Sequence, residues 1–386
     1  MKHLSILGST GSIGRNVLKI VEQFPDKFKV TAVAAKYNID LVAEQIRVFH
    51  PDVAVVYDEE HACELRKKVP QASGVEIFYG IEGYIRAATL QRIDMVVMAI
   101  VGSAGLIPTL RAIEAGKDVA LANKETLVMA GEIVMNAAIR HGVHILPIDS
   151  EHSAVFQCLA GHPRQDLEKI ILTASGGPFL TTPIHELADI EPEDALAHPT
   201  WQMGRKISID SATMMNKGFE IIEAKHLFGV DLTQIDVVIH PQSVVHSMVS
   251  FCDGTIIAQM GIPDMKAAIA YAMSHPNRLP LRQPLPDFTK IGALRFEKPD
   301  MEKFPCLFLA YEACRCGGTL PAVLNAVNEI AVEQFLNKKI GFLTIPDIVR
   351  NVMMAHETVY HPSLDAILEA DRWAREKARE FITRRL

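Results

Sequence analysis

Short apolar runs alternate with longer amphipathic segments over the first 150 residues. The short runs are typical of buried strands, and the segments between them have helical spacing. Strands that alternate with helices predict an α/β fold whose first part is a parallel sheet of Rossmann type. The expected strands cover residues 3–7, 29–34, 53–56, 94–99, 119–122 and 143–146.

The pattern changes after residue 151. Short runs rich in β-branched residues follow each other closely, with hairpin-like turns such as Asp253-Gly254, and predict a mostly antiparallel sheet. These strands are expected at 169–173, 206–209, 237–239, 244–251 and 255–260, and a helix is expected to begin near Ser211. From residue 303 the spacing is helical throughout, at 307–314, 320–336, 345–355 and 364–382.

These changes of pattern predict three domains and a linker. A Rossmann-like domain is expected at 1–149, an α+β domain at 150–285, a linker at 286–302 and a helical bundle at 303–386. A chain of 386 residues, 49% of them hydrophobic, is long enough to build such cores.

Composition excludes several classes of partner. The net charge is −7, so a nucleic-acid or anionic-membrane footprint is not expected. The longest apolar stretch, 95–107, is interrupted by glycines and is too short to span a bilayer. The first strand begins at residue 3, which predicts no signal or transit peptide. Six scattered cysteines without a CxxC pair indicate reduced thiols in a cytoplasmic protein.

The sequence GSTGSIG follows the first expected strand and precedes a helix. Its glycines stand at Gly8, Gly11 and Gly14, a spacing of GxxGxxG. Gly8 permits a tight turn, Gly11 lets the backbone approach a pyrophosphate, and the helix N-terminus favours an anion. The motif therefore predicts a dinucleotide site, although an ordinary turn is the alternative.

The end of the second strand carries no carboxylate. NAD-binding folds place an acidic residue there for the ribose hydroxyls, whereas this chain has Lys36 and Asn38. A cation and an amide suit a 2′-phosphate, so NADPH is favoured over NADH. A plain surface lysine is the alternative for Lys36.

Polar triplets follow two later strands, Asn123-Lys124-Glu125 and Asp149-Ser150-Glu151. Both should lie at the carboxyl edge of the sheet, where ligands bind in such folds. Asp149 and Glu151 could hold Mg²⁺ or Mn²⁺, which prefer carboxylate oxygens. The alternative is an acidic pair that caps the following helix.

The segment HPTWQMGRKISIDSATMMNKGFE from residue 198 carries a further constellation. Asn216, Lys217 and Glu220 share one helix face, which suggests a combined anion and metal site, with a solvated helix face as the alternative. Ser175, in the Ser-Gly-Gly turn after residue 174, could hold a phosphate with nearby glycine amides. Residues 198–204 predict a lid with Trp201 as its apolar cover, or else a Trp packed in a domain seam.

Two histidines and two methionines in this half are expected to be structural. His240 and His246 flank a segment that begins with Pro241, which favours buried, hydrogen-bonded imidazoles over ligands. Met214 and Met215 are expected to fill the core.

Taken together, GSTGSIG, ANKE, DSEH, TASGGPF, the segment above, HPQSVVHSMV, GIPDMK and NAVNEIAV resemble the 1-deoxy-D-xylulose 5-phosphate reductoisomerase family. The resemblance implies conversion of this ketose phosphate to 2-C-methyl-D-erythritol 4-phosphate, in the non-mevalonate route to isoprenoids. It implies NADPH, a divalent cation (Mg²⁺, Mn²⁺ or Co²⁺) and a homodimer, with NADPH binding in the first domain and catalysis and dimerisation in the second.

The resemblance also implies roles for individual residues. The metal ligands would be Asp149, Glu151 and Glu220. The catalytic residues would be these three together with Lys124 and His198. NADPH would be held by Thr10, Gly11, Ser12, Ile13, Ala35, Lys36, Asn38, Asn123, Glu125 and Gly204. The substrate would contact Lys124, Ser150, Glu151, Ser175, His198, Trp201, Ser211, Asn216, Lys217 and Glu220. One departure is visible: the family usually has Gly-Lys-Asn after the second strand, where this chain has Ala35-Lys36-Tyr37-Asn38.

Two rival functions use only part of these features. An NADPH-dependent aldehyde or semialdehyde dehydrogenase would share the glycine loop but would not need three carboxylates. A metal-dependent sugar-phosphate isomerase would need the carboxylates but neither Lys36 nor the loop. A nucleotide-sensing protein without catalysis is a third, more distant reading.

Overall fold

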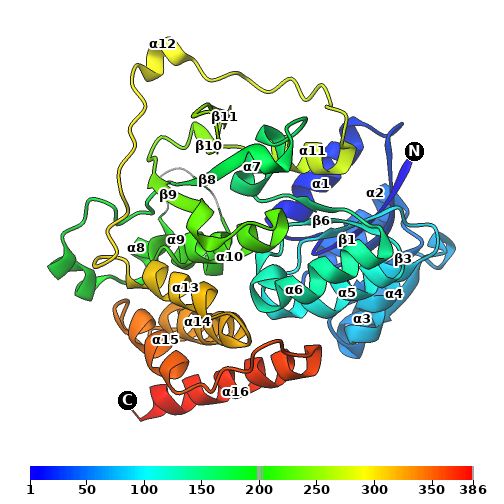
Figure 1. Ribbon diagram of the computed structural model, residues 1–386. Helices are drawn as coiled ribbons and strands as arrows, with labels where there is room; N and C mark the ends of the chain where they lie inside the picture. The colour runs from blue at the N-terminus through cyan, green and yellow to red at the C-terminus, as the bar shows by residue number, and fades with distance from the viewer. Residues whose placement is uncertain (198–200, 202, 385–386) are drawn as a thin grey trace. The chain divides into compact units, whose positions relative to one another are not determined.

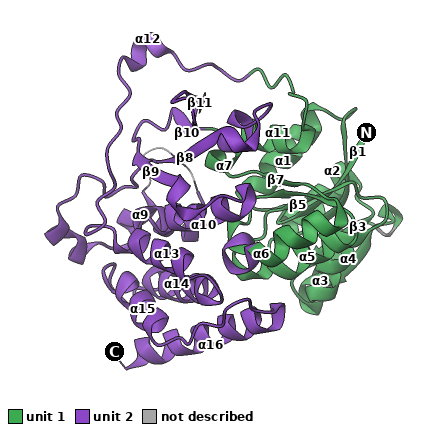
Figure 2. Ribbon diagram, in the orientation of Figure 1, with its two compact units in different colours: residues 1–126, 132–153, 264–282 green, residues 127–131, 154–263, 283–386 purple. Residues whose placement is uncertain are grey.

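The computed structural model describes residues 1–197, 201 and 203–384, which form two compact units. Unit 1 comprises Met1–Thr126, Glu132–Ser153 and Asp264–Arg282, and unit 2 comprises Leu127–Gly131, Ala154–Pro263 and Gln283–Leu386 (Figure 2). The chain crosses between the units several times, so neither unit is one continuous segment. The domain bounds expected from the sequence stay predictions.

Unit 1 is built on a parallel sheet of seven strands within the described residues, in the order β4-β3-β2-β1-β5-β6-β7. Central strands such as β3 and β5 are buried along their whole length, as expected for a sheet covered by helices. The strands are β1 Lys2–Leu7, β2 Phe28–Ala34, β3 Val53–Val56, β4 Glu76–Tyr79, β5 Met95–Met98, β6 Asp118–Leu121 and β7 Ile145–Pro147.

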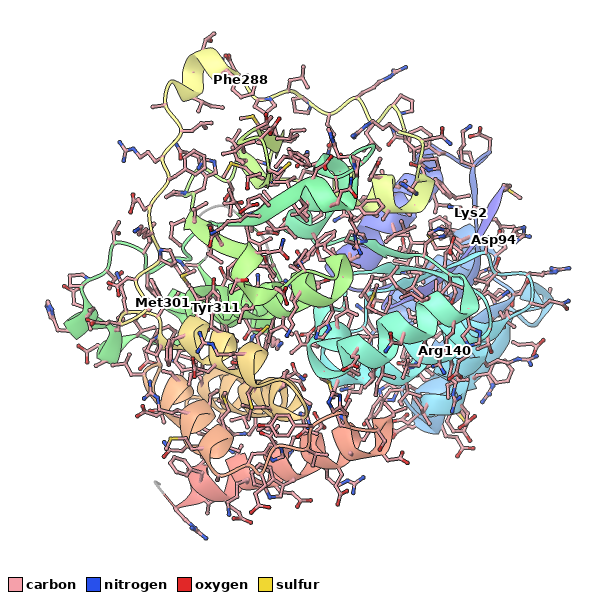
Figure 3. The ribbon with its side chains drawn as sticks, in the orientation of Figure 1. Lys2, Asp94, Arg140, Phe288, Met301 and Tyr311 are labelled. Atoms are coloured by element: carbon pink, nitrogen blue, oxygen red, sulfur yellow. The ribbon has the colours of Figure 1, made fainter. Side chains whose placement is uncertain are left out.

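Helices connect these strands, and α11 (Lys266–Ser274), from much later in the chain, packs among them. Helix α11 packs beside α1 and against β6 and β7 (Figure 1). Lys2, which Figure 3 labels at the start of β1, donates from Nζ to the Met273 carbonyl at 2.8 Å. The other helices are α1 Ser12–Gln23, α2 Ile39–Phe49, α3 Glu59–Lys68, α4 Gly80–Thr89 and α5 Leu106–Glu114, with α6 Lys124–His141 and α7 Ser150–Cys158 contributing to both units.

Unit 2 contains a mixed sheet in the order β11-β10-β8-β9. β10 pairs antiparallel with β8 and β11, while β8 and β9 run parallel. Residues of β10 alternate between buried and half-buried, the pattern of a sheet with one face on the core. The strands are β8 Leu167–Ala174, β9 Ile235–Ile239, β10 Val245–Phe251 and β11 Ile256–Met260.

The helices of unit 2 share one apolar core. Buried side chains of the C-terminal helices pack with Ile209, Met215 and Phe219 of α9 and α10, so the tail is joined to the helices that carry candidate site residues. These helices are α8 Pro192–Leu196, α9 Arg205–Ala212, α10 Met215–Phe228, α12 Phe288–Ile291, α13 Pro305–Cys316, α14 Leu320–Leu336, α15 Thr344–Met354 and α16 Leu364–Thr383. The expected fold class, a parallel sheet followed by a mostly antiparallel sheet and a helical tail, is confirmed.

Two local predictions are wrong, and one strand was not predicted. Residues 206–209 are not a strand but part of α9, in which Lys206 pairs with Asp210 one helical turn later at 2.9 Å. The helix bearing Asn216 begins at Met215 and not near Ser211, because Met214 has a left-handed backbone (φ +60°) that separates it from α9. β4 was missed, since this edge strand is short and half exposed.

In the described residues no helix is long and apolar enough to cross a membrane. The cysteines are free thiols, and Cys158, Cys306 and Cys314 are buried. Met214 and Met215 lie in the core, as expected.

Candidate functional site

The glycine loop of unit 1 has the conformation that its spacing predicts. Gly8 has φ +101°, and a Cβ there would lie 2.3 Å from the Ala99 carbonyl oxygen. A Cβ at Gly14 would lie 2.3 Å from the Gly8 oxygen, so both positions require glycine. Gly11 is exposed and N-caps α1 without a side-chain hydrogen bond. Backbone NH groups at the start of α1 are therefore open to an anionic ligand.

Two hydrogen bonds between a pair of buried residues, which the sequence analysis did not identify, hold the glycine loop in place. Ser9 Oγ donates to Gln45 Oε1 at 2.6 Å, and Gln45 Nε2 donates to the Ser9 carbonyl at 3.0 Å. Both side chains are buried. A glutamine between Ala43 and Ile46, on the apolar face of an expected helix, was the available signal. The pair fixes the loop beside Thr10, Ser12 and Ile13.

The end of β2 presents Lys36 and Asn38 to solvent. Asn38 accepts a hydrogen bond from the Leu41 NH at 3.1 Å and so caps α2. Buried Ala35 is held through its backbone, since its carbonyl accepts a hydrogen bond from the Tyr84 hydroxyl at 2.8 Å. No carboxylate occurs from Ala35 to Asn38, as the sequence indicates.

The Asn123-Lys124-Glu125 triplet is buried at the carboxyl end of β6. The Asn123 amide donates to the carbonyls of Ile100 (2.6 Å) and Gly102 (2.9 Å), while its oxygen accepts from the Thr126 NH at 3.0 Å. Asn123 thus caps α6 and holds the neighbouring loop in place. The Asn123 side chain therefore has a structural role at the carboxyl edge of the sheet, in addition to any contact with a cofactor.

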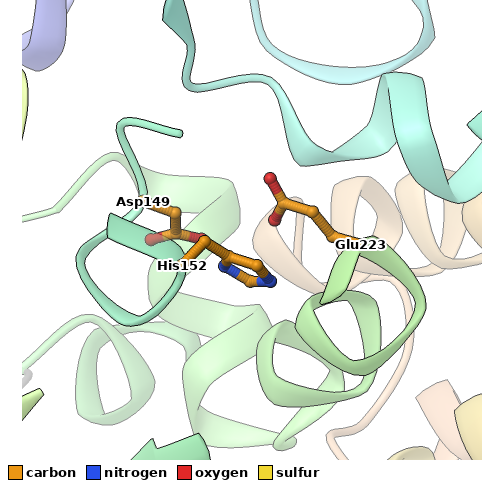
Figure 4. A group of neighbouring side chains, drawn as sticks. All are labelled: Asp149, His152 and Glu223. Atoms are coloured by element: carbon orange, nitrogen blue, oxygen red, sulfur yellow. The ribbon is translucent and has the colours of Figure 1, made fainter. Parts of the chain in front are cut away.

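Lys124 forms a short ion pair with Asp149, so two separate strand ends of unit 1 meet. Asp149 Oδ1 also accepts from the Ser150 NH at 3.1 Å, and Ser150 Oγ donates to Glu151 at 2.6 Å. Figure 4 shows Asp149 and His152 at the start of α7, and Glu223 on α10. Asp149 and Glu151 offer carboxylate oxygens from one short segment, while Lys124 compensates the charge of Asp149.

In unit 2 the Ser-Gly-Gly turn lies against α9. A Cβ at Gly177 would lie 2.6 Å from the Ser211 carbonyl oxygen, and Gly177 has φ +70°. The Gly177 NH donates to Ser175 Oγ at 3.3 Å. The structure therefore places the turn that carries Ser175 next to Ser211, and both hydroxyls are candidates for binding a phosphate.

Helix α10 buries a carboxylate with its partners. Glu220 is 0% exposed, its Oε1 accepts from the Asn216 amide at 2.6 Å, and Lys217 pairs with it at short range. A buried carboxylate is stable only when its charge is compensated, and here a cation and an amide do so. The predicted grouping of these residues is confirmed, and a solvated helix face is excluded because Lys217 and Glu220 are buried.

The lid segment is described only in part. His198 lies outside the described residues. Trp201 is half-buried, with its ring centroid 6.4 Å from that of His246. Gly204 is exposed at the N-terminus of α9, and among the described residues no atom beyond its chain neighbours lies within 4 Å of a Cβ placed there. The predicted lid stays a prediction.

The expectation for the histidines holds for His240. This residue is fully buried, with Nδ1 bonded to the Arg295 carbonyl at 2.8 Å and Nε2 accepting from the Val244 NH at 3.2 Å. Both ring nitrogens therefore serve the structure. His246 is half-buried.

A buried polar cluster supports α9 and was also missed. Asp210, 1% exposed, pairs with Lys206 at 2.9 Å and accepts from the Asn328 amide of α14 at 2.7 Å. Lys206 also lies over the Phe219 ring, 5.0 Å from its centroid. An asparagine inside the apolar run of α14 was the available sequence signal. The residue after Asp210 is Ser211, so this cluster positions a candidate substrate contact.

Comparison with known proteins identifies the family. Models described as 1-deoxy-D-xylulose 5-phosphate reductoisomerase and its C-terminal domains match residues 4–131, 145–228 and 260–377. The reductoisomerase of Desulfosudis oleivorans is 56% identical over 98% of this chain and 99% of its own, and that of Chlorobium limicola is 57% identical over 99% and 100%.

Solved structures agree with these relatives. The reductoisomerase from Zymomonas mobilis in complex with NADPH has a TM-score of 0.92 at 44% identity, covering 99% of both chains. A DOX-P reductoisomerase in complex with NADPH, fosmidomycin and magnesium has a TM-score of 0.93 at 42% identity, covering 99% of this chain and 98% of that one. With such similarity along nearly its whole length, the chain belongs to the 1-deoxy-D-xylulose 5-phosphate reductoisomerase family.

Proposed function

We propose that this protein converts 1-deoxy-D-xylulose 5-phosphate to 2-C-methyl-D-erythritol 4-phosphate with NADPH and a divalent cation, in the non-mevalonate route to isoprenoid precursors. The observation that carries the proposal is the buried Glu220 carboxylate, held by Asn216 and Lys217 in a chain that also has the open glycine loop. A simple dehydrogenase would need only the loop, and a simple isomerase only the carboxylate.

Asp149, Glu151 and Glu220 would hold the cation, and their oxygen-only donor set fits Mg²⁺, Mn²⁺ or Co²⁺. The cation would act as a Lewis acid on adjacent substrate oxygens. Glu220 has a suitable character, because its charge is already compensated in the interior by Lys217 and Asn216. A cation that takes over this compensation would release Lys217 and Asn216 to bind substrate oxygens. Lys124, paired with Asp149, would steady negative charge that develops on the substrate.

The nicotinamide cofactor would occupy the rim of unit 1 and supply the hydride. The NH groups near Gly11 would receive its pyrophosphate, and Lys36 the 2′-phosphate. Thr10, Ser12 and Ile13 would bind beside the loop, Ala35 and Asn38 at the end of β2, and Asn123 and Glu125 at the end of β6. Gly204 would contribute from the lid.

The sugar phosphate would be bound mainly by unit 2. Ser175, Ser211, Asn216 and Lys217 offer hydroxyl, amide and ammonium donors suited to a phosphate. Ser150 would contribute from unit 1, with His198 and Trp201 from the lid closing over the substrate and excluding water.

Domain roles and assembly complete the proposal. Residues 1–149 would bind NADPH, residues 150–285 would carry catalysis and dimerisation, residues 286–302 would link, and residues 303–386 would support the fold. The enzyme would act as a homodimer in the cytoplasm.

One assay separates this function from its rivals. NADPH oxidation should require 1-deoxy-D-xylulose 5-phosphate, stop on addition of EDTA and return with excess Mg²⁺ or Mn²⁺. Oxidation that persists in EDTA would favour a plain dehydrogenase. Conversion of the sugar phosphate without NADPH would favour an isomerase.

A further inference from the structure

An aromatic–lysine cluster follows the ends of β2 and β3 in unit 1, formed by Lys36, Tyr37, Tyr57 and His61. The two tyrosine rings meet edge to face, with centroids 5.1 Å apart. Lys36 Nζ lies 4.9 Å from the Tyr37 centroid and 5.0 Å from the Tyr57 centroid. The His61 ring lies 5.4 Å from Tyr37.

This cluster presents both apolar surface and positive charge to solvent. Tyr37 is 55% exposed and Tyr57 is 46% exposed, although neighbouring residues of β2 and β3 are fully buried. In the described part of the chain the Lys36 ammonium makes no ion pair. Exposed aromatic rings beside an uncompensated cation are typical of a binding surface for a planar, anionic ligand.

The backbone beneath the cluster is held in place. The Tyr57 NH donates to the Lys36 carbonyl at 3.2 Å, and the Ala35 NH donates to the Val55 carbonyl at 2.9 Å. These bonds join the loop after β2 to the end of β3. Asp58, which follows Tyr57, engages His61 through Oδ1 at 2.6 Å and caps α3. The rings are thus preorganised, which reduces the entropy lost on binding.

The position of the cluster indicates its ligand. In dinucleotide folds the end of the second strand meets the adenosine ribose, and the glycine loop after the first strand meets the pyrophosphate. An aromatic face gives a purine an offset stacking partner, while a lysine pairs with a phosphate. Tyr57, twenty-one positions after Lys36, reaches this place only because β3 lies next to β2 in the sheet.

We propose that Tyr37 and Tyr57 form an adenine platform that, with Lys36 between them, selects the 2′-phosphorylated adenosine of NADPH. The platform rests on the proposed function for its cofactor and adds Tyr37 and Tyr57 as adenine-binding residues, while Lys36 distinguishes the 2′-phosphate. It also gives a role to Tyr37, at the point where the chain departs from the usual Gly-Lys-Asn sequence.

Calorimetric titration with adenosine 2′,5′-bisphosphate and with 5′-AMP tests the platform without catalysis. The bisphosphate should bind the wild-type protein more tightly than 5′-AMP. Lys36→Ala should weaken only the bisphosphate, whereas Tyr57→Leu and Tyr37→Leu should each weaken both ligands about tenfold, through lost stacking. Tyr79→Leu is the matched control, because Tyr79 is an exposed tyrosine of unit 1 outside the cluster, and it should bind as the wild type does.

Turnover supplies a second readout. The tyrosine variants should raise the KM for NADPH and leave kcat near the wild-type value at saturating NADPH. Unchanged affinity for both nucleotides in a Tyr37→Leu/Tyr57→Leu variant, with native circular dichroism, would overturn the platform. Loss of the proposed reaction in the wild-type protein, with nucleotide binding as described, would overturn the proposed function and leave the platform standing.

Discussion

The two compact units hold their candidate site residues by different means. In unit 1 these residues follow the ends of parallel strands, on the loops and first helical turns after β1, β2, β6 and β7. In unit 2, Ser211, Asn216, Lys217 and Glu220 lie on α9 and α10, two helices separated by the left-handed residue Met214. Unit 1 uses backbone topology to collect them, because parallel strands end at one edge. Unit 2 uses buried polar pairs.

The difference predicts where each unit is vulnerable. Glu220, Asp210 and Glu223 of unit 2 are almost completely buried, whereas Lys36, Gly11 and Ser12 of unit 1 are exposed. A buried charge that loses its partner destabilises the fold strongly, but an exposed one does not. Substitutions at these buried residues of unit 2 should therefore affect folding, and substitutions at these exposed residues of unit 1 should affect cofactor binding.

The largest effect is expected from Glu220→Gln. Loss of a charged ligand from the proposed metal site should lower turnover by about a hundredfold or more, while the Kd for NADPH, whose proposed site lies in unit 1, should change little. Stopped-flow turnover at several Mg²⁺ concentrations and NADPH fluorescence titration measure the two quantities. Glu312→Gln, at an exposed ion pair of α13, is the control. Near-normal turnover at low Mg²⁺ would remove Glu220 from the metal site.

Lys206→Met should have the next largest effect, lowering the free energy of unfolding by about 3 kcal/mol. The substitution keeps most of the packing on Phe219 but leaves the buried Asp210 carboxylate with the Asn328 amide and without the Lys206 cation. Urea unfolding followed by circular dichroism measures the change. Lys169→Met breaks the exposed pair with Asp236 and should cost less than about 1 kcal/mol. Equal losses in the two variants would refute the contrast between buried and exposed pairs.

His226 of unit 2 should make stability depend on pH. Burial, with a smaller repulsion from Lys225, lowers the pKa of His226 to about 4 from an ordinary value near 6.5. Between these values the unfolded chain binds the additional proton, so stability is full above pH 6.5 and falls as the pH drops toward 4. The loss between pH 7 and pH 5 should be about 2 kcal/mol. His226→Gln should flatten this part of the pH profile of urea unfolding, and an unchanged slope would contradict the assignment.

Asn123→Ala tests a buried hydrogen-bonded side chain of unit 1. Removing the cap of α6 and its bonds to the Ile100 and Gly102 carbonyls should lower stability by about 1–2 kcal/mol. Asn38→Ala removes an exposed cap and should cost less. Thermal unfolding of both variants provides the measurement. A larger loss at Asn38 would show that exposure does not govern the strength of these caps.

Trp201→Phe should have the smallest effect on stability and the clearest effect on fluorescence. The chain has two tryptophans, and the second, Trp373, lies on α16. If the predicted lid closes over the substrate, binding should change the intrinsic fluorescence, and Trp201→Phe should abolish most of that change. A signal that persists in Trp201→Phe and vanishes in Trp373→Phe would refute the lid.

Much of unit 1 was predictable from local pattern. The glycine spacing required Gly8 at positive φ, and apolar runs marked every strand except β4, whose edge position leaves it too exposed to show such a run. The absence of a carboxylate after β2 is visible in the sequence alone.

In unit 2, the helical spacing of Asn216, Lys217 and Glu220 also predicted that these side chains would meet, because neighbours on a helix face interact wherever the helix lies.

Contacts between segments distant in the chain could not be predicted from the sequence. Isolated β-branched residues at 206–209 suggested a strand, but a helix is favoured there because Asp210 finds Lys206 one turn away and Asn328 across 118 positions. Tyr57 joins Lys36 only through the pairing of β2 with β3. Local propensity and periodicity are set by a residue and its near neighbours. Which buried charge meets which partner depends on how the whole chain packs, so only the tertiary structure decided it.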